Sequence, residues 1–447
     1  MNRRGRELML LVVAGIGVTA AYATVLVAQS QAVELASLAW GAAFLALTLG
    51  VHLATRRFVP QADPYLIPAT ALLSGLGVTV ITRLKPDLAG RQTLWLVISA
   101  GLLVLLIAKL KDHRSLERIK YVIGASAVLA LLITVSPLGY EVNGAQLWIN
   151  LGLFQIQPGE FAKLGMVIFL AAYLRDTREL LGMGVSLRHL APLLAFWGAS
   201  IALLVLMNDF GTSLLFYGGF LMMLYVATSR AWYVVAGGAA FAAASALVYS
   251  AASHVQQRFD VWLDPWKDPQ GTGYQLIQGL FALADGGLSG RGLGQAYLVT
   301  NSGETLIPFA HTDFVFAALA DEVGFVGAVG VLLVYVIVAW RGFAIAARSR
   351  DGFSKLLAFG LATIFALQVI VIVGGVVRLL PLTGQTLPFM SYGGSSVLAN
   401  FLLIGLLLVI SHRTNMELDE RITAASHDAH APSSGQRPPN AQAGLVR

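Results

Sequence analysis

Several charged residues lie at the ends of long apolar stretches or inside them. If such stretches cross a membrane, a charge near the middle costs about 2.5–3.5 kcal/mol on insertion scales, so each one needs a reason. Glu160 and Lys163 are three residues apart in QPGEFAK and share one face of a predicted helix. The pair either neutralises itself, or Lys163 meets an anionic head group that enters from outside. Asp209, in MNDFGT, is either a helix N-cap or a polar group of the same site.

Acidic residues also gather after position 310. His311, Thr312 and Asp313 directly precede a long apolar run in IPFAHTDFVF, and either Thr312 or Asp313 could cap the helix that follows. Asp321 and Glu322 lie about two turns further along that predicted helix. Capping does not explain this accumulation of acids. We therefore expect an acidic helix face that lines a cavity.

The last apolar run is preceded by the Gly- and Pro-containing stretch PLTGQTLPFMSYGGSSVLAN. Irregular backbone at membrane depth is tolerated only where protein or a water-filled cavity satisfies its polar groups. The backbone N–H groups around Gly393, Gly394, Ser395 and Ser396 could bind phosphate, as helix N-termini do. Close helix packing explains the same small residues equally well.

The elements that must position these residues are membrane helices. Of the 447 residues, 57% are hydrophobic and 12% are charged, against about 45–50% and 25% in an ordinary soluble chain. The chain contains no cysteine, which excludes disulfide bonds, a thiolate nucleophile and a sulfur-based zinc site.

Apolar runs of about 20 residues predict an all-α bundle of about twelve transmembrane helices. We place them at 7–28, 36–53, 64–82, 92–109, 119–136, 159–174, 188–207, 209–227, 231–250, 313–340, 356–378 and 388–411. The first run follows Arg3, Arg4 and Arg6, as in a cleaved signal peptide, but its length favours a membrane anchor.

The placement of Lys and Arg predicts that both termini are cytoplasmic, because these residues concentrate in the loops that are then inside. The exception is an outside loop with Arg83, Lys85 and Arg91. The net charge of +6 therefore reflects topology and does not indicate nucleic-acid binding.

Two outside loops are long, at 137–158 and 251–312, and long ordered loops are usually functional. The second combines aromatic residues, charges and glycines in RFDVWLDPWKDPQGTGYQ and ADGGLSGRGLGQ. The tail, residues 413–447, is polar and contains prolines, and we predict that it is disordered.

Five blocks in this order resemble the SEDS family of polytopic glycosyltransferases, the RodA/FtsW/SpoVE type. The blocks are NGAQLWINLGLFQIQPGEFAKL, MNDFGTSLLFYGG, GYQLIQGLFALADGGLSGRGLGQ, HTDFVFAALADEVGFVG and PLTGQTLPFMSYGGSSVLANFLLIGLLLVIS. The resemblance divides the chain into two additional N-terminal helices at 1–58, a glycosyltransferase core at 59–412 and the tail, an arrangement similar to actinobacterial RodA-like members. The chain departs from the usual family pattern at Leu147, Gly159, Asn208 and Phe309.

The resemblance implies a peptidoglycan glycosyltransferase that polymerises lipid II and releases undecaprenyl diphosphate. It assigns catalysis to Asp313, which matches the aspartate of the family's TDF motif, as the base for the acceptor hydroxyl. Lys163, Arg258 and a divalent cation, Mg²⁺ or Mn²⁺, would stabilise the departing diphosphate, and Asp313 could also contact the metal. No organic cofactor is expected. Further substrate contacts are predicted for Glu160, Trp148, Asp209, His311, Thr312, Glu322, Ser395 and Ser396.

The resemblance also implies a partner and a place in the cell. The partner is a class B penicillin-binding protein, a transpeptidase of the elongation or division machinery. The enzyme would lie in a bacterial plasma membrane with its active site on the outer face. Two alternatives remain on sequence grounds: a transporter that flips lipid II across the membrane, and a noncatalytic scaffold for a penicillin-binding protein.

Overall fold

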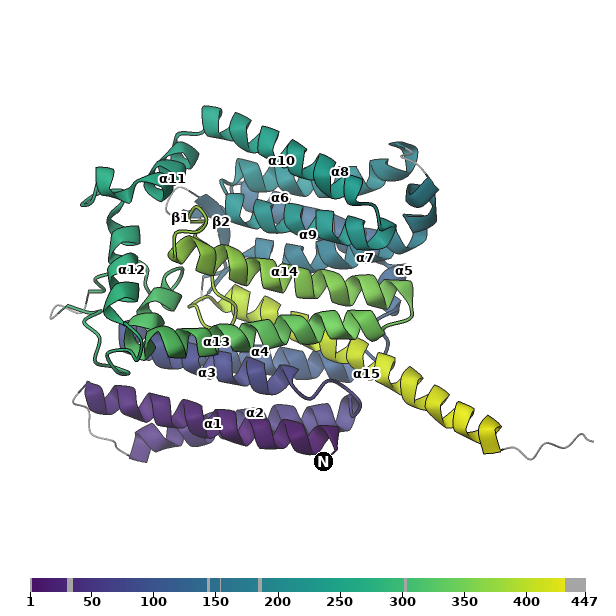
Figure 1. The fold of residues 1–447 in the computed structure, drawn as a ribbon, viewed down its shortest axis with the longest axis horizontal. Coiled ribbons are helices and arrows are strands. Elements are labelled where there is room, and N and C mark those ends of the chain that lie inside the picture. Colours follow the sequence, from purple (N-terminus) through teal and green to yellow (C-terminus); the bar gives the residue numbers. More distant parts are fainter. Residues whose placement is uncertain are drawn as a thin grey trace, which may run out of the picture.

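The computed structural model describes residues 2–29, 35–142, 145–152, 154–183, 187–300 and 304–430. Within these ranges, long helices form at all twelve predicted positions and run along one common direction (Figure 1). They are α1 (Arg3–Ala28), α2 (Leu35–Phe58), α3 (Leu66–Leu84), α4 (Pro86–Lys109), α6 (Lys120–Val135), α7 (Pro158–Met183), α8 (Leu187–Leu206), α9 (Phe210–Thr228), α10 (Ala231–Ala251), α13 (Val315–Arg348), α14 (Gly352–Val376) and α15 (Gly394–His430).

Length and composition make this bundle a multi-pass membrane protein. Within the described ranges, eight helices are long and apolar enough to cross a membrane, and α6 and residues 191–206 form shorter apolar helices. Large apolar side chains face outward, as Val13 does at 63% exposure and Leu247 at 70%. Such exposure is costly in water but is expected where lipid surrounds the helices.

Shorter elements gather at the two ends of the bundle. The loop at 137–158 folds into a small antiparallel sheet of order β1-β2-β3, an addition to the all-α fold that sequence patterns did not predict. The short elements are α5 (Ser115–Arg118), β1 (Gly139–Val142), β2 (Ala145–Asn150), β3 (Gln155–Ile156), α11 (Ser253–Leu263), the 3₁₀ helix η1 (Pro265–Lys267) and α12 (Tyr274–Asp285). Figure 1 shows α11, α12 and the sheet at one end, and α5, the N-terminus and the projecting end of α15 at the other.

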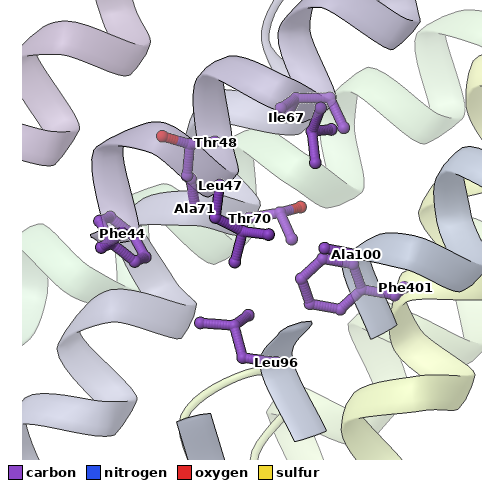
Figure 2. A pocket seen from close by; sticks show the side chains of 10 residues that line it. Phe44, Leu47, Thr48, Ile67, Thr70, Ala71, Leu96, Ala100 and Phe401 are labelled. Atoms are coloured by element: carbon purple, nitrogen blue, oxygen red, sulfur yellow. The ribbon is translucent and has the colours of Figure 1, made fainter. Parts of the chain in front are cut away.

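The additional helices α1 and α2 form a hairpin that packs against α3 and α4. Tyr22 stacks on Trp40 at 4.3 Å between ring centroids, and Trp40 stacks on Phe44 at 5.6 Å. Figure 2 shows the small apolar crevice that remains between α2 and the core, where Phe44 and Phe401 face one another across it. The hairpin is thus a packed part of the bundle.

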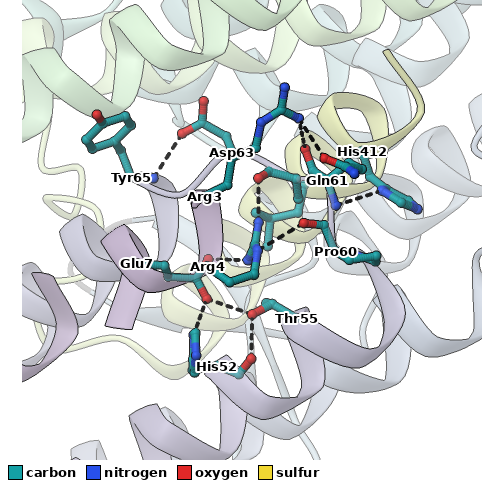
Figure 3. A network of polar contacts seen from close by, with 12 residues as sticks. Arg3, Arg4, Glu7, His52, Thr55, Pro60, Gln61, Asp63, Tyr65 and His412 are labelled. Atoms are coloured by element: carbon teal, nitrogen blue, oxygen red, sulfur yellow. Dashed lines mark hydrogen bonds and ion pairs between the residues drawn. The ribbon is translucent and has the colours of Figure 1, made fainter. Parts of the chain in front are cut away.

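A buried polar network joins the hairpin to the core at the end where the N-terminus lies (Figure 3). The fully buried Glu7 contacts Arg4 of its own helix, and it lies 2.7 Å from both His52 Nδ1 and Thr55 Oγ1 of α2. Each buried charge therefore has partners, as it must in a low-dielectric interior. Nearby, Asp63 pairs with Arg341 of α13, so the α2–α3 connection is anchored to the core as well.

Two long helices differ from the prediction. Gly324 interrupts α13 with φ 70° and ψ −176°, a conformation open to glycine but not to other residues. The helix α15 continues to His430, so the prediction of a disordered tail is wrong for residues 413–430. Residues 431–447 lie outside the described part of the chain.

Candidate functional site

A cavity of about 410 Å³ opens between α11, α12 and the loop that joins α14 to α15. The helix α11 contributes Gln257, Arg258, Val261 and Trp262, which lie on one helix face because residues four apart are neighbours. The remaining lining residues are Ala145, Asn208, Thr272, Gln275, Leu276, Asp313, Leu380, Leu382 and Gly384. Both apolar and hydrogen-bonding side chains line this space, as in sites that hold small-molecule ligands.

Asp313 lies at the cavity wall, just before the first turn of α13. Thr312 Oγ1 lies 3.0 Å from Asp313 Oδ1 and 3.0 Å from Phe309 O, so its one hydroxyl proton can be donated to either acceptor. The backbone on its N-terminal side is fixed by the loop before α15, because Ser391 Oγ donates to Thr312 O and Tyr392 N donates to His311 O at 2.8 Å. Asp313 is therefore held in place by contacts with a distant segment of the chain.

The surroundings of Asp313 favour a proton acceptor that works near neutral pH. Burial raises its pKa to about 6, although the Thr312 hydroxyl, the Arg258 charge and the Gln275 side chain act in the opposite direction. An ordinary aspartate has a pKa of about 3.9 and is a weaker base. A carboxylate with a pKa near the working pH can accept a proton efficiently and release it again.

Arg258 is the one cation, and Asp313 the one carboxylate, among the described residues that line the cavity. Arg258 Nη1 donates to Thr383 O at 3.3 Å and to Leu382 O at 3.5 Å. Burial lowers the pKa of Arg258, whereas the charges of Asp209 and Asp313 oppose this shift. A guanidinium so placed can bind a phosphate that enters the cavity.

Glu160 and Lys163 form the neutralising pair that their spacing allowed. Both side chains are 3% exposed, and Lys163 Nζ lies 2.9 Å from Glu160 Oε2. Lys163 Nζ also donates to Gln368 Oε1 of α14 at 3.1 Å. Neither residue lines the cavity, so a direct contact of Lys163 with a diphosphate stays a prediction.

Asp209 caps α9, as its sequence position allowed, and its Oδ1 accepts from Thr212 N at 2.9 Å and from Gln385 Nε2 at 3.1 Å. Its Oδ2 is buried and has no hydrogen-bond partner within the described part of the chain. The charge of Asp209 acts on Arg258, and the charges of Glu160 and Lys163 act on Asp209. Asp209 thus interacts electrostatically with the Glu160–Lys163 pair and with Arg258 of the cavity wall.

Asp321 and Glu322 have arginine partners and do not line the cavity. Arg291 Nε lies 3.5 Å from Asp321 Oδ1, and Arg83 Nε lies 3.3 Å from Glu322 Oε1. Arg83 Nη2 also donates to Ala296 O at 2.9 Å. Asp321 and Glu322 thus tie α13 to Arg291 of the long loop and to Arg83 at the end of α3. A substrate contact by Glu322 stays a prediction.

The other predicted site residues also lie away from the cavity wall. Ser395 Oγ accepts from Gln157 N at 2.9 Å, and Ser396 Oγ accepts from Thr386 Oγ1 at 2.8 Å. Trp148 lies in β2 opposite Tyr140. His311 is half-buried with its ring 6.0 Å from that of Tyr392. Substrate contacts by Trp148, His311 and the two serines stay predictions.

Sequence reasoning missed several residues of the cavity wall. Gln257, Trp262, Thr272 and Gln275 all belong to the loop at 251–312. Its dense mixture of aromatic and polar residues marked the segment, but the sequence could not show which side chains face inward. The amide of Gln275 also donates to Pro308 O at 2.8 Å, which ties α12 to the segment before Asp313.

The side chains around the cavity determine which kind of metal site it can form. The described residues contain no group of three or more His, Asp or Glu side chains that could hold a metal ion. Mg²⁺ is usually bound through one or two carboxylates together with substrate phosphates. A cavity with the single carboxylate Asp313 fits a cation that arrives with a phosphorylated substrate, and it does not fit an all-protein metal cage.

Known proteins resemble this chain over most of its length. Residues 68–416 match the model of the FtsW/RodA/SpoVE family, which is described as cell cycle proteins. The peptidoglycan glycosyltransferase RodA of Mycobacterium tuberculosis is 43% identical over 441 residues, which cover 94% of this chain and 93% of that protein.

Two solved structures share the fold. One comes from a study of how a peptidoglycan synthase complex coordinates polymerization and crosslinking; its matched chain is 30% identical, with a TM-score of 0.67 over 79% of this chain and 98% of that chain. The other is the rod shape determining protein RodA of Thermus thermophilus, also 30% identical, with a TM-score of 0.54 over 79% of this chain and 97% of that one.

Proposed function

Because the chain belongs to the FtsW/RodA/SpoVE family and is a peptidoglycan glycosyltransferase, we propose that it polymerises lipid II with Asp313 as the catalytic base. One observation carries this proposal: Asp313 is the single carboxylate on the described wall of the cavity, and its pKa is raised to about 6.

In the proposed reaction, the 4-hydroxyl of an acceptor sugar attacks the anomeric carbon of the donor sugar. The carboxylate of Asp313 takes the hydroxyl proton as the new C–O bond forms. The bond between the anomeric carbon and the diphosphate breaks, and undecaprenyl diphosphate leaves with the bonding electron pair. The proton on Asp313 is then lost to water, which restores the base.

The leaving group develops negative charge that must be stabilised. Arg258 lies in the cavity wall and supplies one positive charge. A diphosphate carries more negative charge than one guanidinium neutralises, so we include a divalent cation, Mg²⁺ or Mn²⁺, that enters with the substrate. When bound, it would be held mainly by the diphosphate oxygens and would act on them as a Lewis acid.

Polymerisation of lipid II by the purified protein in detergent with Mg²⁺ or Mn²⁺ tests the proposal. We expect glycan ladders from the wild type and from the control Asp260→Asn, which changes an exposed carboxylate of α11 outside the cavity wall. We expect none from well-folded Asp313→Ala. Ladders from Asp313→Ala would make this residue structural. No polymer from any variant would favour the transporter or the scaffold.

For its setting, we propose that the protein acts with a class B penicillin-binding protein in a bacterial plasma membrane, both termini inside and the cavity outside. Support comes from the arginine- and lysine-rich loops near the termini and from the structural relative studied as a peptidoglycan synthase complex. The rod shape determining relative favours a role in elongation over one in division. Failure to co-purify with such a transpeptidase, and activity that is indifferent to it, would contradict the partnership.

A further inference from the structure

A reciprocal contact joins Arg378, in the loop after α14, to the C-terminal end of α11. Arg378 Nε donates to Trp262 O at 2.8 Å, and its Nη2 donates to Leu263 O at 2.5 Å. In return, Trp262 Nε1 donates to Arg378 O at 3.2 Å. These three hydrogen bonds link residues more than a hundred positions apart in the chain.

The contact satisfies groups that a helix end leaves open. The last carbonyl groups of a helix lack partners within the helix, and the helix dipole makes that end favourable for a cation. The guanidinium of Arg378 meets both needs for α11, since it bonds the carbonyls of Trp262 and Leu263. The contact therefore stabilises the position of the whole short helix.

The backbone of Arg378 points to a role for its side chain. Its φ is 60°, in the left-handed region where glycine is favoured and an L-residue is strained. Glycine would adopt this conformation more easily. It would, however, lack the positive charge at the end of α11 and both hydrogen bonds that the guanidinium donates there. The residue at this strained position is thus an arginine, whose planar guanidinium can donate hydrogen bonds to two carbonyls at once.

The same helix carries the cation of the cavity. Arg258 and Trp262 are four residues apart, so they lie one turn from each other on the cavity face of α11. Arg258 bonds the carbonyls of Leu382 and Thr383 in the loop that also contains Arg378. Nearby, an added Cβ at Gly384, which has φ 68°, would lie 4.0 Å from Arg258 Nη2. The loop between α14 and α15 therefore holds α11 at two points.

We propose that Arg378 is a positioning residue that fixes the guanidinium of Arg258 at the cavity wall and thereby sets the affinity for the diphosphate of the substrate. The inference rests on the proposed role of Arg258 and extends it to a residue that does not line the cavity. Without the side chain of Arg378, the hydrogen bonds that hold α11 to this loop, within the described part of the chain, are the two longer bonds of Arg258 and the bond from Trp262 Nε1 to Arg378 O. Arg258 then cannot keep one fixed geometry for an incoming phosphate.

The test is a double-mutant cycle on the binding of undecaprenyl diphosphate, measured by calorimetry on the full chain in detergent. We expect Arg258→Gln to weaken binding about tenfold or more, and Arg378→Gln to weaken it about five- to tenfold. In the Arg258→Gln background, Arg378→Gln should weaken binding less than about twofold further, because its effect acts through Arg258. The control Arg350→Gln, an exposed arginine outside the cavity wall, should bind like the wild type.

Hydrogen exchange gives a second readout that does not depend on the ligand. We expect Arg378→Gln to speed amide exchange in residues 253–263 while exchange in α10 stays unchanged. If Arg378→Gln does not fold, Arg378→Lys keeps the charge but loses the planar fork, and it should give the same changes to a smaller degree.

The outcomes separate the two proposals. Wild-type affinity in Arg378→Gln, beside weak binding in Arg258→Gln, overturns the positioning role and leaves the proposed function standing. An effect of Arg378→Gln that is undiminished in the Arg258→Gln background, or unchanged exchange in α11, also overturns the positioning role. Wild-type binding in Arg258→Gln overturns the assigned diphosphate contact and the inference that rests on it.

Discussion

The raised pKa of Asp313 predicts how polymerisation depends on pH. Burial moves this pKa from 3.8 to about 6, and the base must be ionised to accept the acceptor proton. With a pKa of about 6, about nine-tenths of Asp313 is ionised at pH 7 and about one-tenth at pH 5. The polymerisation rate at saturating lipid II should therefore fall about tenfold between pH 7 and pH 5, with a midpoint near pH 6.

Thr312 allows the origin of this midpoint to be tested. Its hydroxyl lies 3.0 Å from Asp313 Oδ1 and favours the ionised form when it donates there. Thr312→Val removes this donor, which is worth about 1.5 kcal/mol for a charged acceptor, or roughly one pKa unit. The acid midpoint should therefore move upward towards about pH 7, while Thr312→Ser, which keeps a hydroxyl, should stay near pH 6.

The assay is the initial rate of glycan formation from labelled lipid II at several pH values, with protein folding checked at each. A midpoint near pH 4 would refute the raised pKa of Asp313. A midpoint near pH 6 that Thr312→Val does not move would show that another group controls it. His311→Gln serves as a control and should leave the midpoint in place.

Three other results should follow. Lys163→Met leaves the buried Glu160 without its cation, so thermal unfolding in detergent should show a loss of about 3–5 kcal/mol, and adding Glu160→Gln should recover part of it. Gly394→Ala would place a Cβ 2.2 Å from the Trp95 ring and should cost about 1–3 kcal/mol, whereas Gly101→Ala meets nothing within 4 Å and should be neutral or stabilising. Removal of divalent cations with a chelator should stop polymerisation without unfolding the protein, and added Mg²⁺ or Mn²⁺ should restore it; full activity in excess chelator would contradict the role of the cation.

The twelve long helices could be predicted because each is a long apolar run, and lipid exposure requires such runs whatever the tertiary contacts. The break in α13 could not be predicted in this way. Its apolar pattern continues through Gly324, and only the φ of 70° shows that the chain turns there. Asp321 and Glu322 lie in the first turns of α13, as predicted, and just before this break.

The catalytic candidate was found because Asp313 matches the aspartate of the family's TDF motif; its position beside a helix start was equally compatible with a helix cap. Its neighbours were harder to find, because they are brought together by tertiary contacts. Arg258 and Asp313 share a cavity although they belong to different helices, and Gln275 faces the same space. The contacts of Lys163 with Glu160 were foreseeable from their spacing, whereas those with Gln368 were not.

In the proposed mechanism, Asp313 performs the chemical step and is not needed for binding. Single-turnover coupling of preloaded lipid II, measured by rapid quench for the wild type and Asp313→Asn, separates the two roles. We expect Asp313→Asn to slow coupling about 10²- to 10⁴-fold while it binds undecaprenyl diphosphate no more weakly than the wild type. Coupling within about threefold of the wild-type rate would contradict the assignment of Asp313 as the base.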